Sequence, residues 1–132
     1  MISLSNFHTA VNAFVKTLTA AQIAAVIYPA NNPTQRAKWS NFPTGIFQRN
    51  GLKIGKMTAT QTNALGAMLT AVLSPEGFQK VSAIVQADEA LRSQGGGGNL
   101  IFGTNEYYVS LVGTPSLTNK YLLQFGGHHL AY

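Results

Sequence analysis

The chain has 132 residues, 45% of them hydrophobic, which is enough for one domain with a core of ordinary size. It contains no cysteine, and this excludes disulfides, thiolate nucleophiles and cysteine-based zinc sites. Nine Lys and Arg residues against four Asp and Glu residues give a net charge of +5, but the cations are scattered, so they favour a solvated surface over nucleic-acid binding. No apolar run reaches the roughly 18 residues of a membrane span. Residues 1–14 also lack the charged start and apolar block of a signal peptide.

The first 29 residues predict a pair of helices. Apolar side chains recur at helical spacing between Asn6 and Leu18, which places them on one stripe. Thr19 has the character of an N-cap for a second, shorter helix, and Pro29 ends it.

Residues 29–57 predict an irregular loop, because they contain three prolines and three glycines. A short extended piece is expected within residues 46–54. Two interpretations stay open for this loop. It forms part of a ligand pocket, with Arg36 and Trp39 as binding residues, or it is a surface connection held by Trp39 and Phe42.

The second half of the chain predicts two further helices and then strands. Thr58 caps one helix with Gln61 at the capping-box position, and Ser74 followed by Pro75 starts another that runs to about Ser93. After residue 105 the hydrophobic period changes to two, and a turn-rich segment separates two apolar runs. We expect an α+β fold in which about four helices pack on a C-terminal antiparallel hairpin or small sheet.

One acid stands where a leucine is expected. On a helical wheel of about 100° per residue, Asp88 lies at the centre of the apolar face of the last helix. An unpaired buried carboxylate is very costly, so Asp88 needs a polar cavity, a hydrogen-bonding partner or a proton.

Two adjacent histidines near the end of the chain are the candidate partners. If the last strand is regular, His129 shares the apolar face with Leu123 and Phe125, and His128 faces the other way. A bulge at the preceding two glycines would re-aim the pair. Adjacent histidines in a regular strand cannot both bind one metal ion.

We therefore expect Asp88 and His129 to meet under the sheet. The functional interpretation is a catalytic pair in which His129 is a general base oriented by Asp88, with Arg36 binding an anionic substrate group, or the start of a divalent-metal site that involves His128 and His129. The structural interpretation is a hydrogen bond that satisfies both buried groups. The structural interpretation is favoured, since no third ligand stands at helical or strand spacing.

Five blocks occur in order along the chain, namely RAKWSNFPTG, RNGLKIGKMTATQ, LSPEGFQKV, YYVSLVGTPS and LLQFGGHHLAY. Together they resemble the domain of unknown function 3500 family. That resemblance carries over no activity, cofactor or catalytic residue. It implies longer relatives, with further sequence after the GHHL block, and many that look exported, which hints at a periplasmic or extracellular location.

Two functions from different classes follow as expectations. The first is a small-molecule or metal-binding protein, or an enzyme, with a pocket between the 29–57 loop and Asp88 with His129. The second is a non-catalytic interaction domain. It would form a homo-oligomer through the C-terminal strand or through the face that carries Leu122, Leu130 and Tyr132.

Overall fold

The computed structural model describes residues 3–95 and 97–132. Its α-helices are α1 (Leu4–Lys16), α2 (Ala20–Val26), α3 (Pro33–Arg36), α4 (Ala59–Val72) and α5 (Pro75–Ser93), with short 3-10 helices η1 (Ile54–Lys56) and η2 (Thr104–Glu106). The strands are β1 (Ile27–Tyr28), β2 (Leu52–Lys53), β3 (Tyr108–Val112), β4 (Leu122–Gly127) and β5 (Leu130–Ala131). The predicted α+β class is confirmed. Within the described ranges, none of the helices combines the length and the apolarity that crossing a membrane requires.

Side-chain caps begin the helices where the sequence predicts them. Thr58 and Gln61 form a reciprocal capping box at the start of α4, and the hydroxyl of Ser74 accepts the Gly77 amide at the start of α5. A second capping box at Thr19 starts α2. That helix is shorter than expected, because Ile27 and Tyr28 pair with β3 as strand β1.

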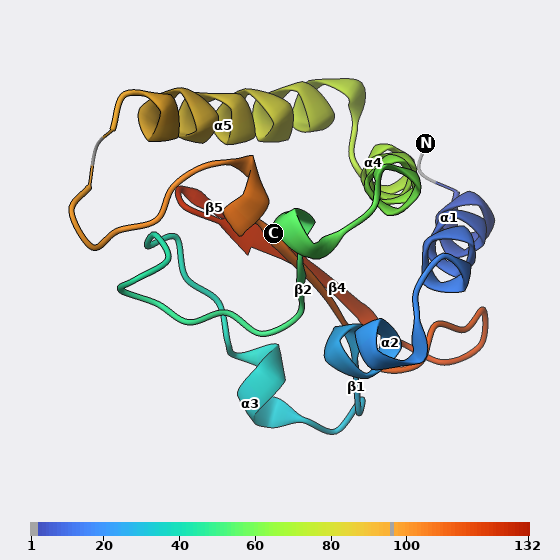
Figure 1. Cartoon of the computed structure of the whole chain (residues 1–132). Coiled ribbons are helices and arrows are strands. Elements are labelled where there is room, and N and C mark those ends of the chain that lie inside the picture. The colour runs from blue at the N-terminus through green and yellow to red at the C-terminus, as the bar shows by residue number, and fades with distance from the viewer. Residues whose placement is uncertain (1–2, 96) are drawn as a thin grey trace.

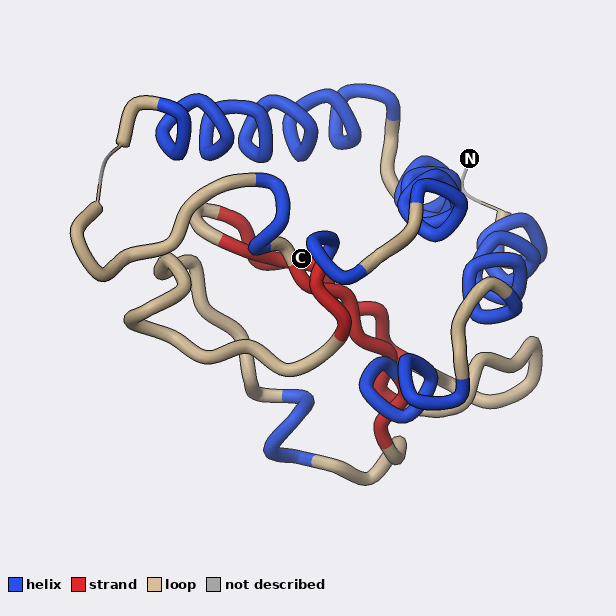
Figure 2. The backbone as a smooth tube through the Cα atoms, in the orientation of Figure 1, coloured by secondary structure: helices blue, strands red, loops and turns tan. Residues whose placement is uncertain are grey.

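A five-stranded sheet forms the centre of the fold, as the red segments of Figure 2 show. The predicted antiparallel hairpin is strands β3 and β4, with Val109 opposite Phe125. β1 runs parallel to β3 and β2 antiparallel to it, while β5 pairs with β4. These three added strands have only two residues each, too few to show a hydrophobic period.

The sheet has two different faces. Val109 and Leu111 of β3, with Leu123 and Phe125 of β4, enter a core that α1, α2, α4 and α5 share. Figure 1 shows α1, α4 and α5 on one side of the sheet, and α3 with the loop that follows it on the other. Because side chains alternate along a strand, Ser110 and Gln124 face this second side.

Two glycines provide a matched test of this architecture. Gly51 has a φ of +107°, and a Cβ there would lie 2.3 Å from the Val109 carbonyl oxygen. We expect Gly51→Ala to lower the free energy of unfolding by at least about 2 kcal/mol. Gly66 lies inside α4 with open space around it, so Gly66→Ala should raise that free energy by about 0.5–1 kcal/mol. Urea unfolding measures both, and equal effects of the two substitutions would contradict this account of the β2–β3 contact.

Candidate functional site

Asp88 is buried, as the helical pattern predicts, and both of its carboxylate oxygens have partners. The side chain lies in α5 with a residue exposure of 5%. Its Oδ1 atom is 2.6 Å from Nδ1 of His128, and its Oδ2 atom accepts the backbone amide of Gly103 at 2.7 Å. An imidazole and an amide therefore stabilise the carboxylate inside the apolar face.

The predicted partner of Asp88 was wrong by one residue. His128, not His129, makes the contact with Asp88. The alternation of β4 stops at Gly127, because the two histidines form a two-residue turn between β4 and β5. His129 adopts a φ of +61°, its backbone amide binds the Asn41 carbonyl, and its side chain is exposed. A strand pattern continued into a turn assigns the wrong side chain to the core.

The turn is packed against Tyr107, a fully buried aromatic residue. The Tyr107 hydroxyl donates to the His128 carbonyl at 2.7 Å. A Cβ on Gly127 would lie 2.6 Å from the Tyr107 ring, so only glycine fits there. Burial raises the pKa of the Tyr107 hydroxyl, and the Asp88 carboxylate raises it further, so this group stays a donor at neutral pH.

Arg49 joins the same turn to the 37–51 loop. Its Nη2 atom donates to the Gly127 carbonyl at 2.9 Å and to the Ser40 and Phe42 carbonyls at 2.7 Å each. Nothing in the sequence pattern predicts this bridge, because its partners are backbone carbonyls 7 to 78 residues away. Arg49 thus fixes the loop against the end of the sheet.

The neighbouring acid, Glu89, has a separate role. Its Oε2 atom accepts the Thr104 amide at 2.8 Å, and its other oxygen binds Arg92. The hydrogen bonds from Arg92 and then from Thr104 lower the pKa of Glu89. Adjacent carboxylates of α5 therefore bind the adjacent amides of Gly103 and Thr104, at the start of η2.

The histidine geometry gives no support to a metal site. The rings of His128 and His129 stack with centroids 3.9 Å apart and planes 27° apart, and Nδ1 of His128 contacts Asp88. No group of three or more His, Asp or Glu side chains suited to a metal ion occurs in residues 3–95 and 97–132. Asp88 and His129 do line a shallow hollow beside α5, together with Ile84, Leu91 and Gln94. We call it the His129 hollow.

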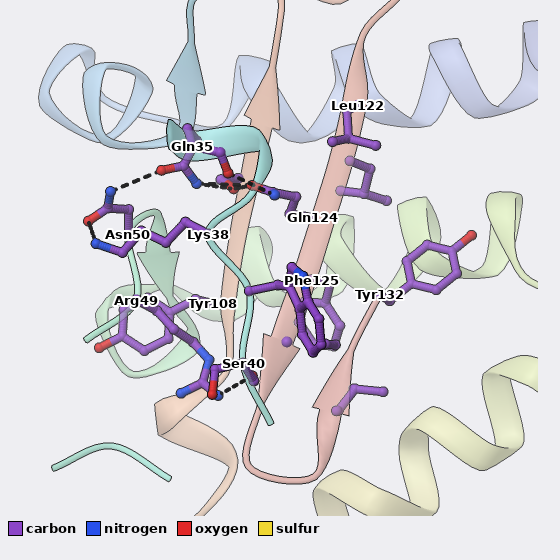
Figure 3. A pocket seen from close by; sticks show the side chains of 16 residues that line it. Gln35, Lys38, Ser40, Arg49, Asn50, Tyr108, Leu122, Gln124, Phe125 and Tyr132 are labelled. Carbon is purple, nitrogen blue, oxygen red and sulfur yellow. Dashed lines mark hydrogen bonds between the residues drawn. The ribbon is translucent and has the colours of Figure 1, made fainter. Parts of the chain in front are cut away.

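A second hollow lies on the other face of the sheet, beneath the 37–51 loop (Figure 3). We call it the Trp39 hollow. Its volume is about 360 Å³, and it is lined from the loop by Lys38, Trp39 and Arg49 and from strands β4 and β5 by apolar side chains including Leu122 and Leu130. Trp39 therefore lines a hollow, but not the predicted one, because Asp88 and His129 lie outside it. Arg36 does not line this hollow, and its guanidinium instead donates to the Ala30 carbonyl.

A chain of amide side chains forms one wall of the Trp39 hollow. Lys38 donates to Asn50, Asn50 donates to Gln35, and the Gln35 amide donates to both Gln124 and Ser110. The side-chain amide of Gln124 donates a hydrogen bond to the backbone carbonyl of Gln35 at 3.0 Å. The wall links α3, the loop and both central strands, so these side chains have defined positions.

The expected single pocket is thus divided in two. The Trp39 hollow and the His129 hollow have no lining residue in common. The contact between Asp88 and His128 holds the β4–β5 turn in place. Residues of the 37–51 loop instead line the Trp39 hollow on the opposite face of the sheet.

A family model described as "Protein of unknown function (DUF3500)" matches residues 2–132. The chain belongs to the DUF3500 family. The match extends over nearly the whole chain and confirms the resemblance that the five sequence blocks carry. No curated protein and no solved structure matches it. DUF3500 membership assigns no site, so function must be argued from geometry.

The Asp88–His128 pair of this DUF3500 chain is testable by stability. We expect His128→Ala to lower the free energy of unfolding by about 3 kcal/mol, because it removes one partner of a buried carboxylate. The control is His129→Asn, which keeps a residue that tolerates positive φ and should cost less than about 1 kcal/mol. Urea unfolding at pH 7 measures both. A larger loss for His129→Asn would restore the pairing expected from strand alternation.

Proposed function

We propose that the protein binds a small organic molecule in the Trp39 hollow. The observation that carries this proposal is the gathering of exposed apolar side chains around one concave surface. Trp39, Leu122 and Tyr132 are 69%, 37% and 47% exposed, and all three line the same hollow. Large apolar side chains that remain in water at one place are typical of a binding surface.

The size and lining of the hollow agree with a small-molecule site. A volume of about 360 Å³ falls in the range of ligand pockets. Most of the lining surface is apolar, and the amide wall supplies a few polar groups. Burial of an apolar ligand body against the apolar side chains would lower the free energy of binding. A polar substituent on the ligand would then orient it by hydrogen bonds to the amide wall.

The Asp88–His128 pair has a positioning role in this proposal. It anchors the turn that joins β4 to β5, and Leu130, Ala131 and Tyr132 of the hollow follow that turn directly. Arg49 connects the turn to the loop that forms the opposite wall. The pair supports the binding surface from behind, and we assign it no contact with the ligand.

A second candidate is self-association through the same face. β5 is the outer strand of the order β1-β3-β4-β5, Tyr132 follows it and is exposed, and Leu122 is exposed at the start of β4. An edge strand with apolar neighbours favours pairing with another chain. A second copy and a small molecule would compete for this surface, so the two candidates separate experimentally.

Ligand binding can be followed by the fluorescence of Trp39, the only tryptophan of the chain. We expect octanamide and octanoate, two small probes without fluorescence, to shift the Trp39 emission to shorter wavelength in a saturable manner. Ala131→Phe should abolish this shift, because Ala131 lines the hollow and a ring there fills it. The control Leu117→Phe changes an exposed residue outside the hollow and should leave the shift intact. Binding that survives Ala131→Phe would show that the probes bind elsewhere.

Sedimentation velocity tests the second candidate. If copies associate through this face, the wild-type chain sediments as a dimer or larger species, and Leu122→Lys converts it to a monomer by placing a charge in the interface. The control substitution is Leu4→Lys, at an apolar residue of α1 that is 62% exposed. A wild-type monomer at all concentrations overturns the self-association candidate and leaves the hollow open to a ligand.

A further inference from the structure

The charged side chains of the Trp39 hollow are all of one sign. Lys38 and Arg49 line it, and no Asp or Glu is among its lining residues. The chain has four acids, and three of them bind partners elsewhere: Asp88 binds His128, Glu89 binds Arg92 and Glu106 binds Lys53. The fourth, Glu76, lies in the first turn of α5. The charged side chains that line the hollow therefore contribute only positive charge to it.

Lys38 keeps donor capacity for a ligand. Its ammonium group makes one hydrogen bond with the described residues, to the amide oxygen of Asn50 at 3.3 Å. An ammonium has three donors, so two remain for water or for a bound group. Lys53, by contrast, already has an anionic partner, because its ammonium lies 2.8 Å from the Glu106 carboxylate. Lys38 is the cation of the hollow that is free to meet a ligand directly.

Arg49 contributes charge without offering a direct contact. Its Nη2 atom is occupied by three neutral carbonyls, and its Nη1 atom is buried without a partner among the described residues. Burial lowers the pKa of Arg49, and the nearby Asp88 and Glu106 carboxylates offset this only in part. The carbonyls orient the guanidinium but leave its net charge in place, at the edge of the hollow.

The cationic and apolar groups occupy opposite sides. Figure 3 shows Lys38, Arg49 and Asn50 on one side of the hollow, and Leu122 and Tyr132 on the other. A ligand that fits both sides has one negatively charged end and an apolar body. A cationic ligand would be repelled by the two positive groups, and a neutral one would leave them unpaired.

We infer that the ligand of the Trp39 hollow is a small organic anion, a carboxylate on an apolar body, whose charged group binds at Lys38 within the field of Arg49. This inference rests on the proposed function, since it names the chemical class of the molecule bound there. The apolar body lies against the strand residues, and Trp39 covers it from the loop.

The test compares two probes of the same shape, one with a charged carboxylate head group and one with a neutral amide. Octanoate and octanamide share one apolar chain, and their dissociation constants are measured by Trp39 fluorescence and by calorimetry at low ionic strength. We expect octanoate to bind about two- to fivefold more tightly than octanamide, which is the range that exposed charge pairs give. Added salt should reduce this preference, because the charges are partly in water.

Substitution of Lys38 assigns the preference to a side chain. Lys38→Met keeps the length of the side chain and removes its charge, so octanoate should lose most of its advantage while the affinity for octanamide stays the same. Lys80→Met, at an exposed position of α5 outside the hollow, removes the same net charge and should leave the preference intact. Arg49 is retained in these experiments, because it holds the turn and the loop together.

The outcomes distinguish the preference for an anion from the more general proposal that the hollow binds a small molecule. Equal affinities for octanoate and octanamide, both abolished by Ala131→Phe, would overturn the anion inference and leave the binding function standing. A preference that Lys38→Met and Lys80→Met reduce alike would also overturn it, since it would reflect net charge alone. Failure of both probes to bind would remove the binding function and the inference together.

Discussion

The need to stabilise a buried carboxylate organises one end of this fold. A buried carboxyl group is costly without hydrogen-bonding partners, and Asp88 finds them in the His128 imidazole and the Gly103 amide. These two groups come from segments 15 and 40 residues away in sequence. Helix α5, the start of η2 and the turn between β4 and β5 are therefore held at one point.

The contacts around Asp88 also affect the other face of the sheet. The turn anchored by His128 is also bound by Tyr107 and by Arg49, and Arg49 in turn binds carbonyls of the 37–51 loop. The strands below and the loop above the Trp39 hollow are thereby set relative to one another. The Asp88–His128 pair on one side of the sheet thus supports the Trp39 hollow on the other, which is the surface for which we propose ligand binding.

The sequence was most informative where a local rule decides the structure. The caps at Thr58 and Ser74 follow from short-range hydrogen bonding, and the buried position of Asp88 follows from helical periodicity, so all three are confirmed. The assignment of His129 failed because alternation applies only within a strand, and β4 ends two residues earlier. Arg36 was expected in the pocket on loop position alone, and the structure places Arg49 and Lys38 there instead.

Four features follow from the residue pattern alone: the α+β class, the helix starts, the hairpin of β3 and β4, and the need of Asp88 for a polar partner. Each of these depends on residues close together in the chain or on one regular period. The tertiary structure alone decided which histidine meets Asp88, how the amide wall is assembled, and that the loop and the acid belong to different hollows. These arrangements join segments as far as 89 residues apart, and no local pattern records which distant side chains will meet.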